Sequence, residues 1–420
     1  MISNKSVLDW PKGTTVYKPE KCYNGFTIIN PFLSRTVYMI NMMGDVVHTW
    51  QIYETEDGGE PLHSIFIEKQ AGGSLMSILW RNQKYFDRHQ RVSQYGVVQV
   101  DWNGDIQWRY LPPEGVSVHH DIERLANGHT MLLGYERRSF PEISKEVIAD
   151  DYFKEIDVEG NILWEWFTCD HFDEFAYSDE TKRLMFEKGG DLFHNNTCTV
   201  LPDTPLGKKD SRFSAGNILG SQRHLGLIYI VDRNSSKVVW QWGTQENGLV
   251  GQHHPTMLHN GNILIYDNGG RSGYPQRHRP KTRLIEIDPV SGQTVWEYGY
   301  EYSQRESSKF SGSSWGSAQR LPNGNTFSLD THSGRIFEVT PYNEIVWEYI
   351  NPFPWGASLS GMNEDEVEYG MYRVFRYGYD AFPEAHQTYT DRDGNSARPS
   401  IVPDASALPD GLGLPAAEPS

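Results

Sequence analysis

The chain has 420 residues and a formal net charge of -17, and aromatic residues make up 13% of it. This acidic balance argues against nucleic acids and anionic membranes as partners, because both require a basic protein surface. The 39 glycines, 23 prolines and abundant aromatic residues favour turns and β-strands over helices. A repetitive all-β fold can use this length as a single unit.

The amino-terminal segment, MISNKSVLDWPKGTTVY, lacks the apolar run of a secretory signal, and no stretch of the chain reaches transmembrane length. We therefore expect no membrane insertion, and a cytoplasmic protein, or a periplasmic one if a signal has been removed. Cys22, Cys169 and Cys198 have no metal-ligand spacing and cannot form a disulfide framework, although one disulfide is compatible with them. The sequence does not determine the oligomeric state.

A short tryptophan-containing pattern recurs six times along the chain. Its copies are GDVVHTW, GDIQW, GNILW, SKVVW, GQTVW and NEIVW, which end at Trp50, Trp108, Trp164, Trp240, Trp296 and Trp347. The steps between these tryptophans are 58, 56, 76, 56 and 51 residues. Most copies follow a strand-like run that closes on an acidic or polar turn, so each copy predicts the second strand of a β-hairpin.

A second pattern lies between these hairpins and consists of two strand-like runs joined by Asn-Gly. It reads HDIERLANGHTMLL at 120–133, HHPTMLHNGNILIY at 253–266 and GSAQRLPNGNTFSL at 316–329. A variant begins at residue 63, and a looser copy with an insertion spans 193–220. Four strands in each of six units predict an all-β fold, a six-bladed β-propeller with four-stranded blades.

The two ends of the chain predict how the propeller closes. Only three strands fit before Trp50, so the first blade lacks its inner strand, and GMYRVFRYGYD at 370–380 could supply it. We predict one propeller domain over 16–387, preceded by an extension over 1–15. The remaining segment, 388–420, is polar and then rich in Pro, Ala and Gly, which predicts a mobile tail.

Histidines begin four of the predicted inner strands, at one mouth of the central channel. They are His63, His120, His194 and His253. Because side chains alternate along a strand, we expect only one histidine of the pairs 119/120 and 253/254 to face the channel, and the spacing to Asn-Gly favours His120 and His253. A single histidine is ordinarily a packing or turn residue, but four at equivalent repeat positions weaken that interpretation.

Arginines end several of the predicted second strands, namely Arg81, Arg137, Arg138, Arg223 and Arg271. Each one alone is explained as a solvated loop residue, whereas the set would make the channel mouth cationic. Such a mouth would attract a sulfate, phosphate or carboxylate. We therefore predict a small anionic or phenolic aromatic substrate. The aromatic residues that could stack on a phenol are Trp80, Tyr135, Tyr266 and Trp315.

From about residue 16 to residue 380 the chain resembles the arylsulfate sulfotransferase family. The shared pattern comprises YNGFTIINP...TVYMINMMGDVVHTW, HHDIERLANG, FHNN followed by NILGSQR, QHHPTMLHNGNILIYDNG and WGSAQRLPNGNTFSL, in this order. This family consists of six-bladed propellers that move a sulfuryl group from one phenol to another without a nucleotide donor. The sequence also lacks the G-x-x-x-x-G-K-[ST] loop that cradles nucleotide phosphates.

The resemblance implies a ping-pong transfer through a sulfated histidine and no cofactor. His253 matches the family's nucleophile, and its neighbour His254 is expected to turn into the blade. His194 and Asn196 match a His-x-Asn pair, whose spacing of two residues would place both side chains on one face of a strand. Arg223 matches the arginine that follows this pair.

These residue types suit sulfuryl transfer. Neutral imidazole is a good nucleophile near pH 7, and attack on sulfur spreads negative charge over oxygens that Arg223, His194 and Asn196 would hold. His120, which matches a further family histidine, would exchange a proton with the phenolic oxygen, as the acid in the first half-reaction and the base in the second. The further candidates for substrate binding are His63, Arg137, Asn268 and Arg271.

Two other interpretations stay open on the sequence alone. A divalent metal could bind in the same funnel, which would make the protein a lyase, hydrolase or oxygenase. An arginine and an asparagine in the cluster instead favour an oxyanion over a cation. The third interpretation is a non-catalytic binding module that uses the propeller as a platform. The ligands of the metal interpretation would be His63, His120, His194 and His253.

Overall fold

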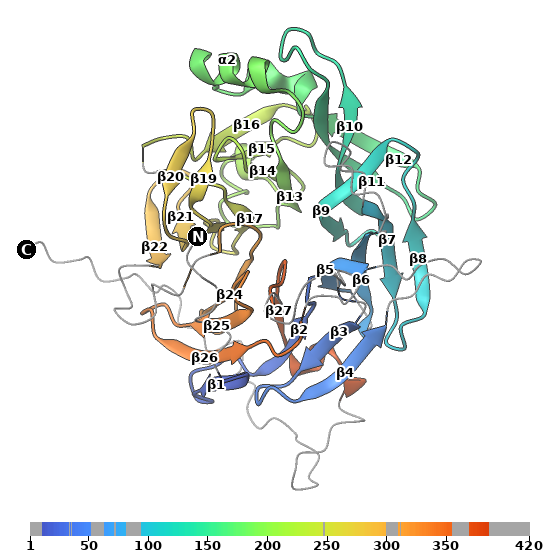
Figure 1. Ribbon diagram of the computed structural model, residues 1–420, viewed down its shortest axis with the longest axis vertical. Helices are drawn as coiled ribbons and strands as arrows, with labels where there is room; N and C mark the ends of the chain where they lie inside the picture. Colours follow the sequence, from blue (N-terminus) through green and yellow to red (C-terminus); the bar gives the residue numbers. More distant parts are fainter. Residues whose placement is uncertain are drawn as a thin grey trace, which may run out of the picture.

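The computed structural model forms a six-bladed β-propeller of antiparallel sheets, as predicted (Figure 1). It describes residues 11–32, 34, 36–51, 63–70, 73–80, 94–246, 248–299, 310, 312–354 and 369–385. The side chains of 63–68, 79, 80, 94 and 95 are not described. The predicted tail at 388–420, Arg81 and the side chains of His63 and Trp80 therefore lie outside the described residues.

The first three blades follow the chain from its amino-terminal part, and within each blade the strands run in order from the inner to the outer edge. Blade 1 contains β27 (Phe375–Gly378), β2 (Gly25–Ile29), β3 (Thr36–Ile40) and β4 (Val46–Gln51). Blade 2 contains β5 (His63–Lys69), β6 (Leu75–Trp80), β7 (Gln94–Val100) and β8 (Ile106–Tyr110). Blade 3 contains β9 (Val116–Arg124), β10 (Thr130–Arg138), β11 (Ile148–Ile156) and β12 (Ile162–Phe167).

The other three blades include two with additional strands. Blade 4 contains β13 (Asn195–Val200), β14 (Ile218–Gln222), β15 (Leu227–Val231) and β16 (Val238–Trp242). Blade 5 contains β17 (His253–Met257), β18 (Ile263–Asp267), β21 (Arg283–Ile287) and β22 (Thr294–Tyr298), with the separate hairpin of β19 (Gly270–Ser272) and β20 (Arg277–Arg279). Blade 6 contains β23 (Ala318–Arg320), β24 (Thr326–Asp330), β25 (Arg335–Val339), β26 (Ile345–Ile350) and a fifth strand, β1 (Gly13–Tyr17).

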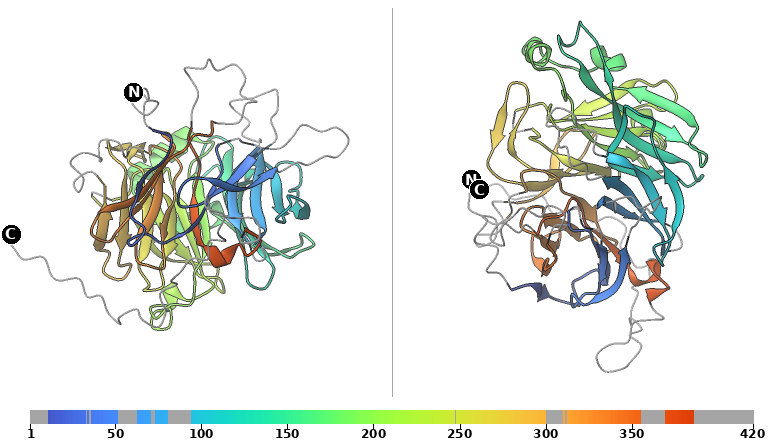
Figure 2. Two further views of the ribbon diagram at one scale, coloured as in Figure 1. Left: turned by 90° about the horizontal axis from the view of Figure 1, so that it is seen from below. Right: turned by 45° about the vertical axis from the view of Figure 1, so that its right-hand side comes forward.

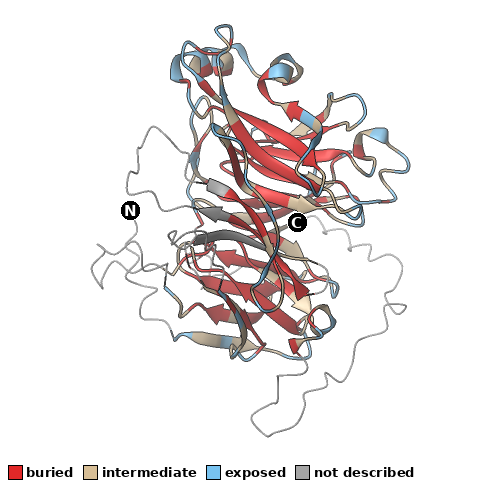
Figure 3. Ribbon diagram, turned by 90° about the vertical axis from the view of Figure 1, so that its right-hand side faces the viewer, coloured by how far each residue is buried: buried red, intermediate tan, exposed pale blue. Residues whose placement is uncertain are grey.

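The core lies between neighbouring blades, where the faces of two sheets pack together. Phe153 of blade 3 stacks on Tyr229 of blade 4, with ring centroids 6.1 Å apart. Between blades 2 and 3, Ile78 and Val118 are buried in one apolar cluster. Figure 3 shows this distribution as buried strands lined by more exposed turns. Because both faces of a blade are covered, its middle strands are largely buried, as in β15, whose five residues LIYIV are all buried.

Five of the six repeated tryptophans donate their indole N–H to the next blade, whereas Trp50 packs edge-on against Trp102 of blade 2, with ring centroids 5.4 Å apart. Indole N–H groups on outer strands donate to main-chain oxygens in the turn between the third and fourth strands of the following blade, as in Trp240 to Pro289 O at 3.0 Å and Trp296 to Pro341 O at 3.1 Å. Trp347 of blade 6 closes the ring by donating to Met42 O of blade 1 at 2.9 Å. The tryptophan pattern recurs in the sequence because a neighbouring blade is contacted at each step.

Two strands from opposite ends of the chain also close the ring. β27 pairs with β2, with Tyr377 opposite Phe26, so the carboxy-terminal strand completes blade 1 as predicted. β1 pairs with β26, with Gly13 opposite Ile350. β1 was not anticipated from the sequence, and it begins inside the segment that we expected to be an extension. The side view in Figure 2 shows the strands of neighbouring blades standing beside one another around the ring.

An insertion between β12 and β13 explains the long step of 76 residues between Trp164 and Trp240. It contains the 3-10 helix η2 (Cys169–Glu174) and the helix α2 (Asp179–Lys188). Ser178 caps α2 by accepting a hydrogen bond from the backbone of Thr181. In the described part of the chain, two further short helices are present, η3 (Ser211–Phe213) and η7 (Tyr379–Ala381). Figure 1 shows α2 at the rim of the ring, beside blades 3 and 4.

All three cysteines are buried and free, so the disulfide that the sequence left open is not formed. In the part of the chain that the structure describes, no helix combines the length and the apolar character needed to cross a membrane.

Candidate functional site

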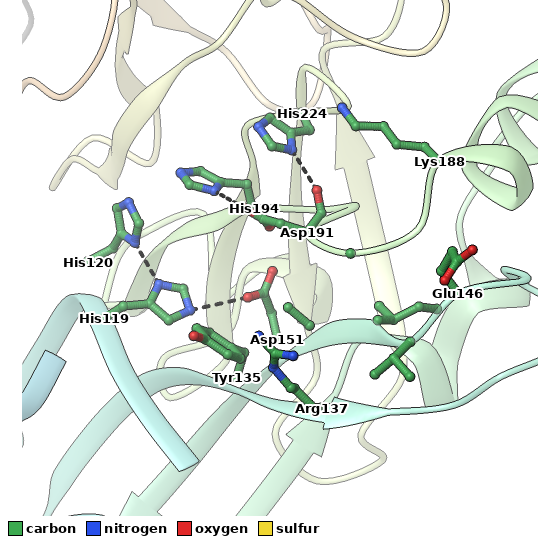
Figure 4. A pocket seen from close by; sticks show the side chains of 14 residues that line it. His119, His120, Tyr135, Arg137, Glu146, Asp151, Lys188, Asp191, His194 and His224 are labelled. Carbon is green, nitrogen blue, oxygen red and sulfur yellow. Dashed lines mark hydrogen bonds and ion pairs between the residues drawn. The ribbon is translucent and has the colours of Figure 1, made fainter. Parts of the chain in front are cut away.

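A cavity of about 600 Å³ lies between blades 3 and 4 and the insertion that carries α2. Strands β9 to β11 and the β10–β11 loop form one wall, and the segment after α2 forms the other. Figure 4 shows the polar side chains of both walls turned toward the same space. The residues that line the cavity are His119, His120, Tyr135, Arg137, Glu146, Val147, Ile148, Ala149, Asp151, Lys188, Gly190, Asp191, His194 and His224.

Two adjacent histidines of β9 are connected in series to a carboxylate of β11. The Nδ1 atoms of His119 and His120 lie 2.6 Å apart, and Nε2 of His119 lies 3.2 Å from Oδ1 of Asp151. The other oxygen of Asp151 accepts hydrogen bonds from the backbone N–H and the side-chain amide of Asn195, at 2.7 and 3.1 Å. These amide groups fix the carboxylate that holds His119.

Both members of this histidine pair line the cavity, although alternation along a regular strand would turn them to opposite faces. Regular alternation fails at this point because His120 has a φ of 60°. The pairing of β9 with β10 also shifts register between Leu132 and Gly134, which marks a bulge beside the pair. A bulge redirects side chains that a regular strand would send to opposite faces.

The opposite wall holds a second group of polar residues around Asp191. Oδ2 of Asp191 lies 2.6 Å from Nδ1 of His194, and Nδ1 of His224 donates to the backbone oxygen of Asp191 at 3.0 Å. The rings of His194 and His224 stack with centroids 4.7 Å apart. Burial and the neighbouring His194 lower the pKa of His224 to about 3. His224 is therefore neutral near pH 7.

The same three residues offer metal-ligand atoms that lie within 4.8 Å of one another. Among the described residues this is the one such group, and it shares only His194 with the metal set predicted from the sequence. His120 and His253 are not part of it, and the side chain of His63 is outside the described residues. The predicted ring of four metal-binding histidines is therefore not assembled in the described part of the chain.

His253 occupies a separate, fully enclosed position at the start of β17. Its Nδ1 lies 2.7 Å from Oδ1 of Asn268 and 3.1 Å from the backbone oxygen of Gly251. Asn268 donates its amide hydrogens to the backbone oxygens of Gly312 and Trp315, at 2.6 and 2.7 Å, which fixes its oxygen toward His253. Two acceptors at Nδ1 place the ring proton there and leave the lone pair on Nε2.

The surroundings of His253 and His120 disfavour their protonated forms. Burial is the largest cause that lowers the pKa of His253 well below its usual value, and Arg223 lowers it further, whereas the hydrogen bond to Asn268 opposes this. Burial likewise lowers the pKa of His120 well below its usual value, followed by the neighbouring basic groups His194, His119, His253 and Arg373. Both imidazoles are therefore neutral near pH 7.

Arg373 is a site residue that was not identified from the sequence. It precedes β27, is 6% exposed, and donates to Oδ1 of Asp121 at 2.7 Å and to the backbone oxygen of Asn196 at 3.0 Å. Its charge contributes to the lowered pKa of His120 and of His253. The segment 370–380 was identified only as a closing strand, and nothing in its local pattern indicated that one of its side chains would lie among the histidines.

His254 does not turn into blade 5, so this expectation is wrong. Its backbone N–H donates to Oγ1 of Thr197 in β13 at 3.1 Å, and its ring meets Phe375 of β27 edge-on at 5.6 Å. Both partners belong to inner strands of other blades, so His254 points toward the central axis. Its φ of 49° turns the side chain away from the direction that regular alternation predicts.

His194 and Asn196 also depart from the predicted arrangement. His194 precedes β13, has a φ of 52° and lines the cavity. Asn196 is fully buried, is not among the lining residues, and donates its side-chain amide to the backbone oxygen of Gln252 at 2.7 Å. Because of the positive φ, the two side chains do not share one face of a strand. Asn196 instead holds the residue that precedes His253.

The predicted arginines are distributed over different environments. Arg223 follows β14, and an Nη atom of its guanidinium lies 3.8 Å from the position that a Cβ at Gly251 would take, beside the loop that leads to His253. Arg137 lines the cavity, whereas Arg271 is exposed on β19 and does not line it. Arg138 lies outside the cavity lining and pairs with Asp150 at 2.7 Å and with Asp170 at 2.9 Å.

Among the predicted aromatic residues, Tyr135 lines the cavity and is 8% exposed. Tyr266 is fully buried and donates to the backbone oxygen of Leu329 at 3.0 Å, and Trp315 stacks on Phe32 at 4.3 Å. No sequence pattern indicated Asp151, Asp191 or His224, apart from the direct adjacency of His224 to Arg223.

The fold and this cavity define a six-bladed propeller with a histidine-rich site between two blades. The model of the arylsulfotransferase (ASST) family matches residues 94–352, and the chain belongs to this family. Membership supports a sulfotransferase-like function and a transferase activity.

The chain is also similar in structure to several solved proteins. A protein of unknown function from Bacteroides caccae is 10% identical, with a TM-score of 0.49, and the match covers 84% of this chain and 98% of that one. A catalytically inactive virginiamycin B lyase from Staphylococcus aureus with quinupristin is 11% identical, with a TM-score of 0.42 and coverage of 82% and 92%. No curated protein matches the chain.

Proposed function

We propose that the protein transfers a sulfuryl group from an aryl sulfate to a phenolic acceptor through a sulfated intermediate on His253. The observation that carries this proposal is the pair of acceptors at Nδ1 of His253, Asn268 Oδ1 at 2.7 Å and Gly251 O at 3.1 Å. They hold the proton on Nδ1 and leave Nε2 as the nucleophile. They also stabilise the positive charge that the ring acquires when Nε2 is sulfated.

In the first half-reaction, Nε2 of His253 forms a bond to sulfur while the bond from sulfur to the phenolic oxygen breaks. Negative charge spreads over the remaining sulfuryl oxygens in this step. Arg223 and His194 are the groups proposed to bind those oxygens, since the basic character of both already acts on the pKa of His253. Asn196 contributes indirectly, by holding the backbone of Gln252.

The second half-reaction returns the sulfuryl group to an acceptor. A phenolic oxygen attacks sulfur, the bond to Nε2 breaks, and the phenolic proton passes to a base on the cavity wall. We assign this base to His120, whose ring centroid lies 4.8 Å from that of His194. Lys188 and Arg137, which line the cavity, supply positive charge where an anionic donor enters.

His253 is 1% exposed and does not line the cavity. The donor therefore reaches Nε2 only if side chains between the cavity and His253 move when it binds. We expect Arg223 to move, because its guanidinium lies beside Gly251 and a bound sulfate would attract it.

Initial-rate kinetics test this proposal. Release of 4-nitrophenol from 4-nitrophenyl sulfate, measured at several phenol concentrations, should give the parallel double-reciprocal lines of a ping-pong reaction. His253→Ala should be inactive, and dialysis against a chelator should leave the wild-type rate unchanged. Intersecting lines, activity in His253→Ala, or a rate that is restored only by added metal would contradict the proposal.

A further inference from the structure

Three connected side chains have a geometry that the transfer mechanism alone does not require, and they are Asp151, His119 and His120. His119 lies between the other two, with its Nε2 3.2 Å from Asp151 and its Nδ1 2.6 Å from Nδ1 of His120 (Figure 4). The side chains of His119 and Asp151 are 6% and 2% exposed. Both ring nitrogens of His119 are thus engaged inside the protein.

The hydrogen-bond requirements of this chain of side chains fix where its protons lie. Ionised Asp151 only accepts, so Nε2 of His119 carries a proton. When His119 carries no second proton, its Nδ1 accepts, and Nδ1 of His120 must donate to it. The remaining nitrogen of His120, Nε2, is left with a lone pair and can accept a proton.

The charged groups around the two histidines differ. His120 is surrounded by basic groups, which are His194, His119, His253 and Arg373. Its ring also lies 5.9 Å from that of Tyr372. His119 instead contacts Asp151 and packs at 5.5 Å against the ring of Tyr135. Positive charge is therefore better accommodated on His119 than on His120.

We propose that Asp151, His119 and His120 form a proton relay that stores the phenolic proton on His119 from the second half-reaction until the first half-reaction of the next turnover. In the second half-reaction the acceptor phenol gives its proton to Nε2 of His120 as its oxygen bonds to sulfur. The proton on Nδ1 of His120 moves to Nδ1 of His119, and His119 becomes an imidazolium beside Asp151. The first half-reaction of the next turnover runs this sequence in reverse. As the bond from sulfur to the phenolic oxygen breaks, His120 gives its Nε2 proton to the departing phenoxide and takes a proton on Nδ1 from the His119 imidazolium.

This inference rests on the proposed sulfuryl transfer and adds a prediction that a purely structural role for His119 would not make. A relay matters only when the phenoxide needs a proton in order to leave. Donors with an acidic phenol, such as 4-nitrophenyl sulfate, depart without one, whereas phenyl sulfate depends on one. Loss of the relay should therefore be selective for donors with basic leaving groups.

The test compares His119→Gln with His129→Gln. Glutamine keeps a donor for Asp151 but cannot take up a proton. His129 offers a matched control, because it also pairs with a carboxylate of β11, Glu155, at 2.7 Å and does not line the cavity. The readout is the rate of phenol release in a single turnover without acceptor, for 4-nitrophenyl sulfate and for phenyl sulfate.

We expect His119→Gln to release 4-nitrophenol within about threefold of the wild-type rate and phenol about 100-fold more slowly, the size of a typical general-acid contribution. His129→Gln should match the wild type with both donors. Equal losses with the two donors, or no loss with either, would overturn the relay. A wild-type protein that takes up no sulfuryl group would instead remove the proposed function.

A second measurement does not depend on a variant. The ring nitrogens of His119 and His120 in the wild-type protein can be assigned by NMR after labelling with 15N-histidine. In the resting protein, which holds the stored proton, we expect protons on both ring nitrogens of His119 and on Nε2 of His120. After sulfation by an aryl sulfate without acceptor, we expect protons only on Nε2 of His119 and on Nδ1 of His120. Unchanged proton positions before and after sulfation would contradict the relay, whatever the stability of the variants.

Discussion

Blade 3 carries a histidine–carboxylate pair at each end of its sheet. At the cavity end His119 meets Asp151 at 3.2 Å, with side-chain exposures of 6% and 2%. At the turn end His129 meets Glu155 at 2.7 Å, with exposures of 31% and 10%. Glu155 is also paired with Arg233, whereas Asp151 is held by the amide groups of Asn195.

Under the proposed relay, this difference separates a pair that supports the sheet from one that serves chemistry. Arg233 neutralises Glu155 whether or not His129 is charged, and water screens the pair. Asp151 is buried and accepts hydrogen bonds from the amide groups of Asn195, so its charge is available to a proton that arrives on His119. The same residue types thus take different roles because their surroundings differ in burial and in permanent cations.

The largest expected effect is the loss of activity on replacing His253, the proposed nucleophile, which belongs to neither histidine–carboxylate pair of blade 3. His253→Ala should lower kcat by at least about 1000-fold, because the covalent step is lost. His129→Ala, at the turn end, should stay within about twofold of wild type. Assays of 4-nitrophenol release check both variants. Comparable activity in His253→Ala and wild type would place the nucleophile elsewhere.

A variant at Glu123 tests how a buried carboxyl group near the turn end of blade 3 affects stability. Burial is the largest cause that raises its pKa from 4.5 to about 7, although it accepts a hydrogen bond from the backbone of Val200 at 2.7 Å. The folded state therefore binds this proton more tightly than the unfolded state, and stability falls as pH rises from about 4.5 to 7.

Glu123→Gln keeps the acceptor and removes this penalty. We expect the variant to be more stable than wild type by about 3 kcal/mol above pH 7, from the shift of the pKa, and equally stable near pH 4. Urea unfolding at several pH values measures the difference. A stability gap that does not change with pH would show that Glu123 is not the titrating group.

Asn268 tests how strongly the tautomer of His253 depends on its neighbour. Asn268→Ala should lower kcat about 100-fold and leave KM within about threefold, because the ring proton loses its acceptor and Nε2 is no longer held as the free nitrogen. Asn260→Ala, in the turn of the same blade, is the control. A variant that keeps kcat but raises KM would assign Asn268 to substrate binding, as expected from the sequence.

The smallest expected effect is on the stability of a variant at Glu155, the carboxylate that pairs with His129. Burial, the largest single cause, raises the pKa of Glu155. Hydrogen bonds from His129 and Arg233 together outweigh burial, so the pKa of Glu155 lies below its usual value. Its contribution to stability is therefore present at neutral pH and lost as pH falls through the folded pKa. Glu155→Gln should destabilise the protein at pH 7 by less than about 1 kcal/mol, the usual size for partly exposed pairs. A larger loss of stability would make this pair more than a surface contact.

Much of the fold could be predicted from the sequence because its determinants repeat. Each tryptophan contacts the next blade, so the pattern recurs at every step, and the absent inner strand of blade 1 left a gap that 370–380 could fill. β1 was missed because five residues form no local pattern, and their partner, β26, lies more than 300 residues away.

The candidate site could be predicted from the sequence less completely than the fold. Alternation along regular strands could not give the directions of His120, His194 and His254, which have φ values of 60, 52 and 49° that depend on tertiary contacts. Asp151 and Arg373 come from segments that show only strand patterns, and the fold brings them to the histidines. Residue types at repeated positions indicated an oxyanion site, but the contacts that set the proton positions are not periodic.

The most direct test is the intact mass of the protein after incubation with 4-nitrophenyl sulfate and no acceptor, followed by peptide mapping. The account predicts the mass of one added sulfuryl group, located on His253, absent from His253→Ala and discharged by added phenol. Turnover of the donor without any adduct, or an adduct on another residue that survives in His253→Ala, would contradict it.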